Sequence, residues 1–140
     1  MIDPLEAVIT YLGNDADLHE VVGNQIAAKH RFGEGWTIPS KAITVHLDGG
    51  EPDIYNERQR PRLEVRCYGE SQYEAMRGYL AMVSAMRAAS TRVVIETNAG
   101  DALIYWMVPT SGPSFFRDPE VGVDVILFFC SACVAEQDVV

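Results

Sequence analysis

In RPRLEVRCYGESQYEAMRGYLAMVSAMRA, residues 60–88, an alternating segment runs directly into a helical one, which predicts a strand followed by a long helix. In its first half, apolar residues alternate with charged ones, a period of two that is typical of a strand with one buried face. These apolar residues are Leu63, Val65 and Cys67. Gly69 then breaks the strand. Ser71 and Glu74 form a capping box that predicts a helix from there to about residue 89.

Two main helices are predicted, each with an apolar stripe at helical spacing. In the helix after Ser71 the stripe consists of Met76, Tyr79, Leu80, Val83 and Met86. The other helix begins near the N-terminus, where Asp3 and Pro4 are a start signal and Gly13 a stop. Its stripe consists of Leu5, Val8, Ile9 and Leu12. We expect both stripes, Leu80 and Val83 included, to be buried, and a short helical turn to follow at 17–22.

Four further strands are predicted from alternation and turn residues. They lie at 42–47, 92–97, 102–108 and 121–134. The sequence NAGD at 98–101 fits a tight hairpin turn, and TSGP at 110–113 is expected in the link to the last strand. That last strand is apolar at nearly every residue from 125 to 129, which predicts a central or doubly covered position. Residues 24–40 are interpreted as a long loop.

These elements predict an α+β fold with a single mixed or antiparallel sheet of about five strands and two main helices packed on one face. The 140 residues have the length of one domain, so residues 1–140 are taken as a single domain. No run approaches the ~18 apolar residues that a bilayer span needs. The net charge of −9 repels phosphate and anionic lipid, which argues against nucleic-acid binding and membrane docking.

No grouping of residues meets the spacing that a catalytic, cofactor or metal site requires. Cys130 and Cys133 have CxxC spacing, but on a strand an offset of three places them on opposite faces. The three histidines are scattered, and glycine motifs for phosphate are absent from the sequence. We therefore predict a protein that is not an enzyme and has no catalytic residue, cofactor or metal. A small cytosolic thiol or metal protein is the alternative, and it requires both cysteines to be exposed in one pocket.

The stretch from Asp48 to Pro61 combines turn residues with dense mixed charge, so it is interpreted as a hairpin tip or an extended arm. Its charges fit a solvated strand face with weak ion pairs, or an arm that recognises an oppositely patterned neighbour. Exposed aromatics elsewhere fit a protein contact as well as a core, since Trp, Phe and Arg are enriched at interface centres. The candidate contact residues are Trp36, Glu51, Asp53, Glu57, Arg58, Arg60, Phe115, Phe116 and Arg117.

The layout resembles the tail terminators, or tail-completion proteins, of long-tailed bacteriophages, a family of minor tail components. The opening DPLEAVITYLGNDADLHEVVG contains the element D-x-x-L-x-x-x-V-G that is frequent there. RPRLEVRCYGES runs into a long helix, and DPEVG at 118–122 precedes the last strand VDVILFFCSACV. The resemblance covers Asp3 to Val134. The chain departs from it in the long loop from Gly23 to Pro39 and in the very hydrophobic last strand.

The resemblance implies a structural virion protein that forms a homo-oligomeric ring, a hexamer, on the completed tail tube. It implies contacts with the tail-tube protein and with the neck or connector proteins of the head, and DNA passing through the lumen without specific binding. The protein would be made in the host cytoplasm and reside in the virion at the head–tail junction. The nearest alternative is a head–neck completion protein of the same virion.

Overall fold

The computed structural model describes residues 3–22, 26–28, 42–53, 58–89, 93–98, 100–118 and 123–136. The helices within these ranges are α1 (Pro4–Gly13), α2 (Ala16–Val22) and α3 (Gln72–Ala89). The strands are β1 (Ile26–Ala28), β2 (Ala42–Asp53), β3 (Arg58–Gly69), β4 (Val93–Thr97), β5 (Gly100–Asp118) and β6 (Val123–Glu136).

One six-stranded sheet has the order β1-β2-β3-β6-β5-β4. Every neighbouring pair is antiparallel except β1 with β2, so the sheet is mixed, as predicted. The added strand, β1, occupies three residues of the segment that the sequence indicated as a loop. β6 lies between β3 and β5, which explains its continuous apolar run and confirms its predicted central position.

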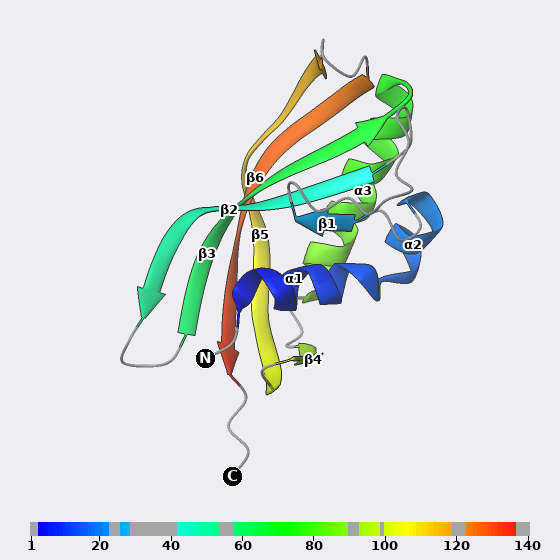
Figure 1. Ribbon diagram of the computed structural model, residues 1–140. Coiled ribbons are helices and arrows are strands. Elements are labelled where there is room, and N and C mark those ends of the chain that lie inside the picture. The colour runs from blue at the N-terminus through cyan, green and yellow to red at the C-terminus, as the bar shows by residue number, and fades with distance from the viewer. Residues whose placement is uncertain are drawn as a thin grey trace.

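The helices lie on one face of this sheet, and the face is the one toward which the alternating apolar residues of the strands point (Figure 1). Leu63, Val65 and Cys67 of β3 are all buried there, as their alternation predicted. In the register, Val65 lies opposite Phe128 and Leu63 opposite Cys130 of β6, so both central strands supply the same core. The other face of the sheet carries the charged residues of β3.

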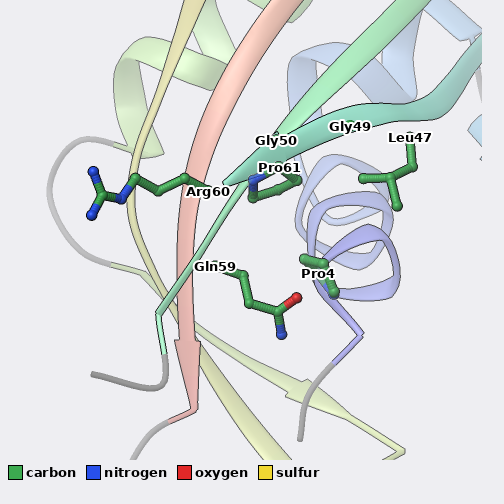
Figure 2. Close-up of a pocket in the computed structure, with 7 residues that line it drawn as sticks. All are labelled: Pro4, Leu47, Gly49, Gly50, Gln59, Arg60 and Pro61. Atoms are coloured by element: carbon green, nitrogen blue, oxygen red, sulfur yellow. The ribbon is translucent and has the colours of Figure 1, made fainter. Parts of the chain in front are cut away.

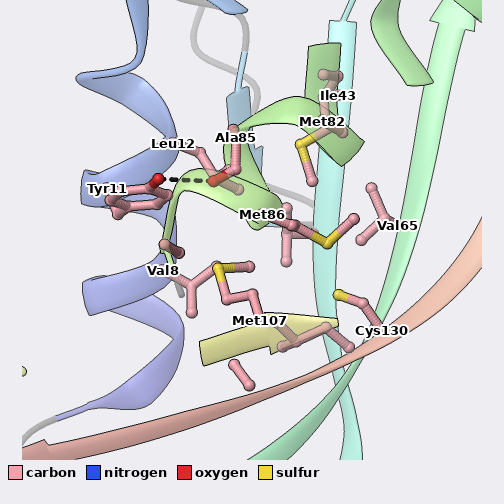
Figure 3. Close-up of a cluster of buried hydrophobic side chains, with 14 of the residues drawn as sticks. Val8, Tyr11, Leu12, Ile43, Val65, Met82, Ala85, Met86, Met107 and Cys130 are labelled. Carbon is pink, nitrogen blue, oxygen red and sulfur yellow. Dashed lines mark hydrogen bonds between the residues drawn. The ribbon is translucent and has the colours of Figure 1, made fainter. Parts of the chain in front are cut away.

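Helix α1 begins at the predicted cap, where the Asp3 carboxylate accepts a hydrogen bond from the Leu5 N–H at 2.9 Å. Val8 and Leu12 are buried as expected, while Leu5 and Ile9 are half-buried against the core. The Tyr11 hydroxyl donates a 2.6 Å hydrogen bond to the Ala85 carbonyl of α3 (Figure 3). This buried bond fixes α1 against α3 beside the methionine and leucine side chains of the core.

Helix α3 corrects one sequence prediction. Leu80 is 57% exposed, and the buried face of the helix consists mainly of small residues. Those buried residues are Ala75, Gly78, Ala81, Met82, Ala85, Met86 and Ala89. A Cβ on Gly78 would lie 3.6 Å from the Cys67 Cβ, so the helix backbone runs close over β3. Of the predicted stripe, Met86 is buried, and Met76, Tyr79 and Val83 are half-buried against the core. Only Leu80 points away from the sheet, because the small residues define a buried face centred to one side of the predicted one.

Strand β5 corrects a second sequence prediction, the link at residues 110–113. Residues 110–113 do not link two strands; they lie inside β5, which continues to Asp118 and pairs with β6 along its length. The register shifts between Pro109 and Ser111 and again between Ser111 and Ser114. A Cβ on Gly112, at a φ of +98°, would collide with Phe128. The turn-forming residues thus produce irregularities within a long strand.

We expect Leu12→Ala to lower the free energy of unfolding by roughly 2–5 kcal/mol, because Leu12 is fully buried and its loss leaves a cavity. Leu80→Ala, which removes the same atoms from an exposed site, serves as the matched control and is expected to cost less than about 1 kcal/mol. Chemical denaturation measures both. Equal losses in the two variants would contradict the observed orientation of α3.

Candidate interaction surface

The most prominent surface feature is the arm, defined here as residues 48–53 of β2 and 58–61 of β3. It bends relative to the rest of these two strands (Figure 1), while Arg58 and Gln59 remain paired with β6. It contains the described part of the stretch that the sequence indicated as a hairpin tip or an extended arm. The bend coincides with a register shift between Leu47 and Gly50. Gly50 has a φ of +129°, and a Cβ there would collide with the backbone of Arg60 and Pro61. Only glycine fits this bulge, so residue type fixes where the arm begins.

The register of the arm pairs residues of opposite charge on its two strands. The register places Glu51 opposite Arg60 and Asp53 opposite Arg58. Such cross-strand pairs stabilise a hairpin by a few tenths of a kcal/mol each. Four candidate contact residues are therefore brought together in two pairs. Glu57 and Trp36, the next candidates, lie outside the described residues.

Three arginines of β3 lie over aromatic rings of β5 and β6, on the face of the sheet opposite the helices. The Arg58 guanidinium is 4.9 Å from the centre of the Tyr105 ring, and the Arg62 guanidinium is 4.7 Å from that of Phe129. The Arg66 guanidinium is 5.9 Å from the Phe116 ring. These contacts hold the guanidinium groups along the sheet surface. We call these six residues the arginine–aromatic face.

Carboxylates accompany the same arginines. Arg66 donates to Glu64 at 2.7 Å, and Arg62 lies 3.7 Å from Asp48. Partial burial opposes charging of Arg66, but hydrogen bonds and charge attraction from Glu64 and Tyr68 outweigh it and raise the pKa of Arg66. The arginine stays charged, so this face presents cations that are already oriented.

The candidates Phe115, Phe116 and Arg117 lie near the end of β5 and are exposed. Phe115 pairs in register with Ile126 and Phe116 with Val125, so the two rings point to opposite faces of the sheet. Arg117 lies 3.7 Å from Asp124 on β6. Phe116 belongs to the arginine–aromatic face, which shares Arg58 with the arm. Sequence reasoning missed Tyr105 and Phe129, because only the strand register shows which rings lie beneath the arginines.

A small cavity of about 200 Å³ lies where the arm meets the start of α1 (Figure 2). Its lining residues are Pro4, Leu47, Gly49, Gly50, Gln59, Arg60 and Pro61. The Arg60 side chain extends away from the other lining side chains in Figure 2. The wall of the cavity is largely apolar. We call this cavity the arm-base pocket.

The cysteines do not form the site that a thiol protein requires. Cys130 points into the core and Cys133 to the opposite face of β6, and both are buried. Burial raises the pKa of Cys130 to about 12 and also raises that of Cys133, against the opposing effect of Arg58 and Arg60. Both thiols are thus held protonated and are poor nucleophiles. This geometry contradicts the shared exposed pocket of the thiol-protein alternative.

Among the described residues, no group of three or more His, Cys, Asp or Glu side chains is arranged to hold a metal ion. His19 is exposed on α2 and His46 is half-buried on β2, while His30 lies outside the described ranges. Over those same ranges, none of the helices combines the length and the apolar character that crossing a membrane demands.

Comparison with known proteins gives a match in fold. No family model and no curated protein matches the sequence. Among solved structures, the fold is similar to a chain in the virion of a native gene transfer agent particle, with a TM-score of 0.60 and 14% sequence identity. The match covers 91% of this chain and 91% of that chain. At this identity the likeness establishes a shared fold over nearly the whole length of both chains.

We expect alkaline pH to destabilise the protein in part through Cys130. Its pKa rises from 9.0 to about 12 on folding, so the folded state retains the thiol proton that the unfolded chain loses. This contribution is complete below about pH 9 and is lost as pH rises toward 12, by roughly 1 kcal/mol per pH unit.

The free energy of unfolding is measured at about four pH values between pH 8 and 11, for wild type and for Cys130→Ala. The variant is expected to lose less stability per pH unit than wild type, whatever its stability at pH 8. Identical slopes would show that the Cys130 thiol is not protonated preferentially in the folded state.

Proposed function

We propose that the protein is a non-enzymatic structural component of a phage-like virion. The observation that carries this proposal is the fold shared over 91% of both chains with a component of a gene transfer agent virion. Two features of the chain support it. The cysteines that a thiol enzyme would use are buried on opposite faces of β6. The chain also carries the arm and the arginine–aromatic face, whose arginines and aromatic rings are of the kind enriched at protein interfaces.

Within that class we propose the role of tail terminator, in which copies of the chain form a ring, a hexamer, on the end of the tail tube. The resemblance of the chain from Asp3 to Val134 to tail-completion proteins supports this role. The net charge of −9 fits a lumen through which DNA passes without adhering. The ring would contact the tail-tube protein on one side and the neck or connector proteins on the other, at the head–tail junction of the virion.

A head–neck completion protein is the second candidate, since it belongs to the same virion and requires the same kind of contact surfaces. The two roles differ in the partner on which the ring assembles. A terminator assembles on the tail tube, whereas a neck-completion protein assembles on the head connector. Binding to the two isolated partners therefore separates them.

The first test is the mass of the purified protein in solution, alone and with assembled tail-tube protein, followed by electron microscopy of the tube ends. We expect a species of low mass alone and a closed ring on one end of each tube in the mixture. Binding to the connector with no binding to tubes would support the neck-completion role. Binding to neither would contradict both candidates.

The second test concerns the arm. Arg58→Glu with Arg60→Glu is expected to abolish ring formation on tubes, because it inverts the charge pattern that a neighbour meets. It also places like charges opposite Asp53 and Glu51, at a cost of about 1 kcal/mol or less per pair. The melting temperature is therefore expected to change by only a few degrees.

A matched variant exchanges the two strands' charges, adding Asp53→Arg and Glu51→Arg to the same pair of changes. It restores the opposite charges across the register but leaves the pattern inverted toward a neighbour. Ring formation is expected to remain lost in this variant. If the exchange restores capping of tubes, the charges serve the hairpin itself and the arm does not select a partner.

A further inference from the structure

The outward face of α3 carries large apolar side chains that lie outside the hydrophobic core. Tyr73 is 71% exposed and Leu80 57% exposed. With the exposed Arg77 between them, they occupy positions i, i+4 and i+7, which share one helix face. The small residues of the opposite face pack on the sheet, so this orientation is set by the core. We call Tyr73, Arg77 and Leu80 the α3 knob.

The surface of the arm-base pocket is largely apolar, and none of the described residues of the same chain covers it. Leu47 lies on the side of β2 that faces the helices, in line with Ile43 and Val45, yet it is 44% exposed. The core ends there because α1 begins only at Pro4, which forms the opposite wall with Pro61 of the arm (Figure 2). The pocket is thus an uncovered continuation of the hydrophobic core.

Size and charge make the two surfaces complementary. An apolar cavity of about 150 Å³ accommodates a benzene-sized group, so the pocket of about 200 Å³ accommodates one side chain such as leucine. Pro4, at the start of α1, lines the pocket, and the exposed Asp3 directly precedes it, so an acidic residue adjoins the pocket. The Glu6 carboxylate of the same turn accepts a hydrogen bond from the Asn98 N–H at 2.9 Å. The α3 knob instead carries the Arg77 cation beside Leu80.

The two surfaces cannot meet within one molecule. β3 runs from the pocket at Pro61 to Gly69, just before α3, which separates the pocket from the start of the helix by roughly 25–30 Å. Figure 1 accordingly places the beginning of α3 at the end of the molecule remote from the arm. A knob and a pocket on different sides of one chain form a head-to-tail contact, and such contacts form a ring when the rotation between successive copies closes.

We propose that Leu80 of one copy inserts into the arm-base pocket of the next copy, with Tyr73 beside the arm and Arg77 facing Asp3. The partner is a second copy of this chain. The inference rests on the proposed ring and identifies the surfaces that join its subunits. It adds a hydrophobic anchor to the charged contacts of the arm.

The direct test is crosslinking of Leu47→Cys with Leu80→Cys in rings assembled on tail-tube protein, using a mild oxidant and non-reducing electrophoresis. We expect a ladder of covalent oligomers that ends at the ring. The native Cys67, Cys130 and Cys133 are all buried, so their background is low. Leu47→Cys with Val94→Cys is the matched control, since Val94 is 49% exposed on β4 and outside the knob.

A second measurement uses Leu80→Ser and Val94→Ser, which alter exposed sites and leave the core intact. Leu80→Ser is expected to lower the yield of capped tubes by about tenfold or more, and Val94→Ser to leave it unchanged. Normal capping by Leu80→Ser, or crosslinks from Leu47→Cys to the tube protein alone, would overturn the inference and leave the terminator proposal intact. Failure of the wild type to cap tubes would overturn both.

Discussion

The close approach of α3 to β3 sets how the helices are oriented on the sheet. Gly78 lies directly over Cys67, and alanines before and after it continue the contact. Small residues on this face allow the helix backbone to approach the sheet closely, with Met82 and Met86 in the core and Leu80 on the outer side. The position of α1 follows, because the Tyr11 hydroxyl must reach the Ala85 carbonyl on the side of α3. The exposure of the large α3 residues follows too.

Strand alternation, caps and turns allowed most of the fold to be predicted from the sequence. The Leu63, Val65 and Cys67 alternation, the Asp3 cap and the capping contact of the Glu74 N–H with the Ser71 hydroxyl are all present. These are local signals, set by neighbours within a few residues. The prediction for Leu80 was wrong because hydrophobicity alone indicated the buried face. Small residues contribute little to an apolar stripe, yet steric fit selects them here.

The candidate surface was predictable only in part, for a related reason. Its charged residues were evident between Asp48 and Pro61, whereas their pairing across the arm depends on a bulge at Gly49 and Gly50. The arginine–aromatic contacts join β3 to residues some 45–70 positions later in the chain, and only the sheet register brings them together. Residues 110–113 were assigned to a link because glycine and proline are typical of turns, although they also occur at strand irregularities.

Both edges of the sheet carry acidic residues, which affects whether two chains can pair edge to edge. In the described structure, β1 pairs only with residues 43–45 of β2. The rest of β2, which includes Glu51 and Asp53, is therefore an edge of the sheet. The opposite edge, β4, carries the exposed Glu96. Two chains that meet edge to edge bring carboxylates together, which disfavours the strand addition that leads to fibres.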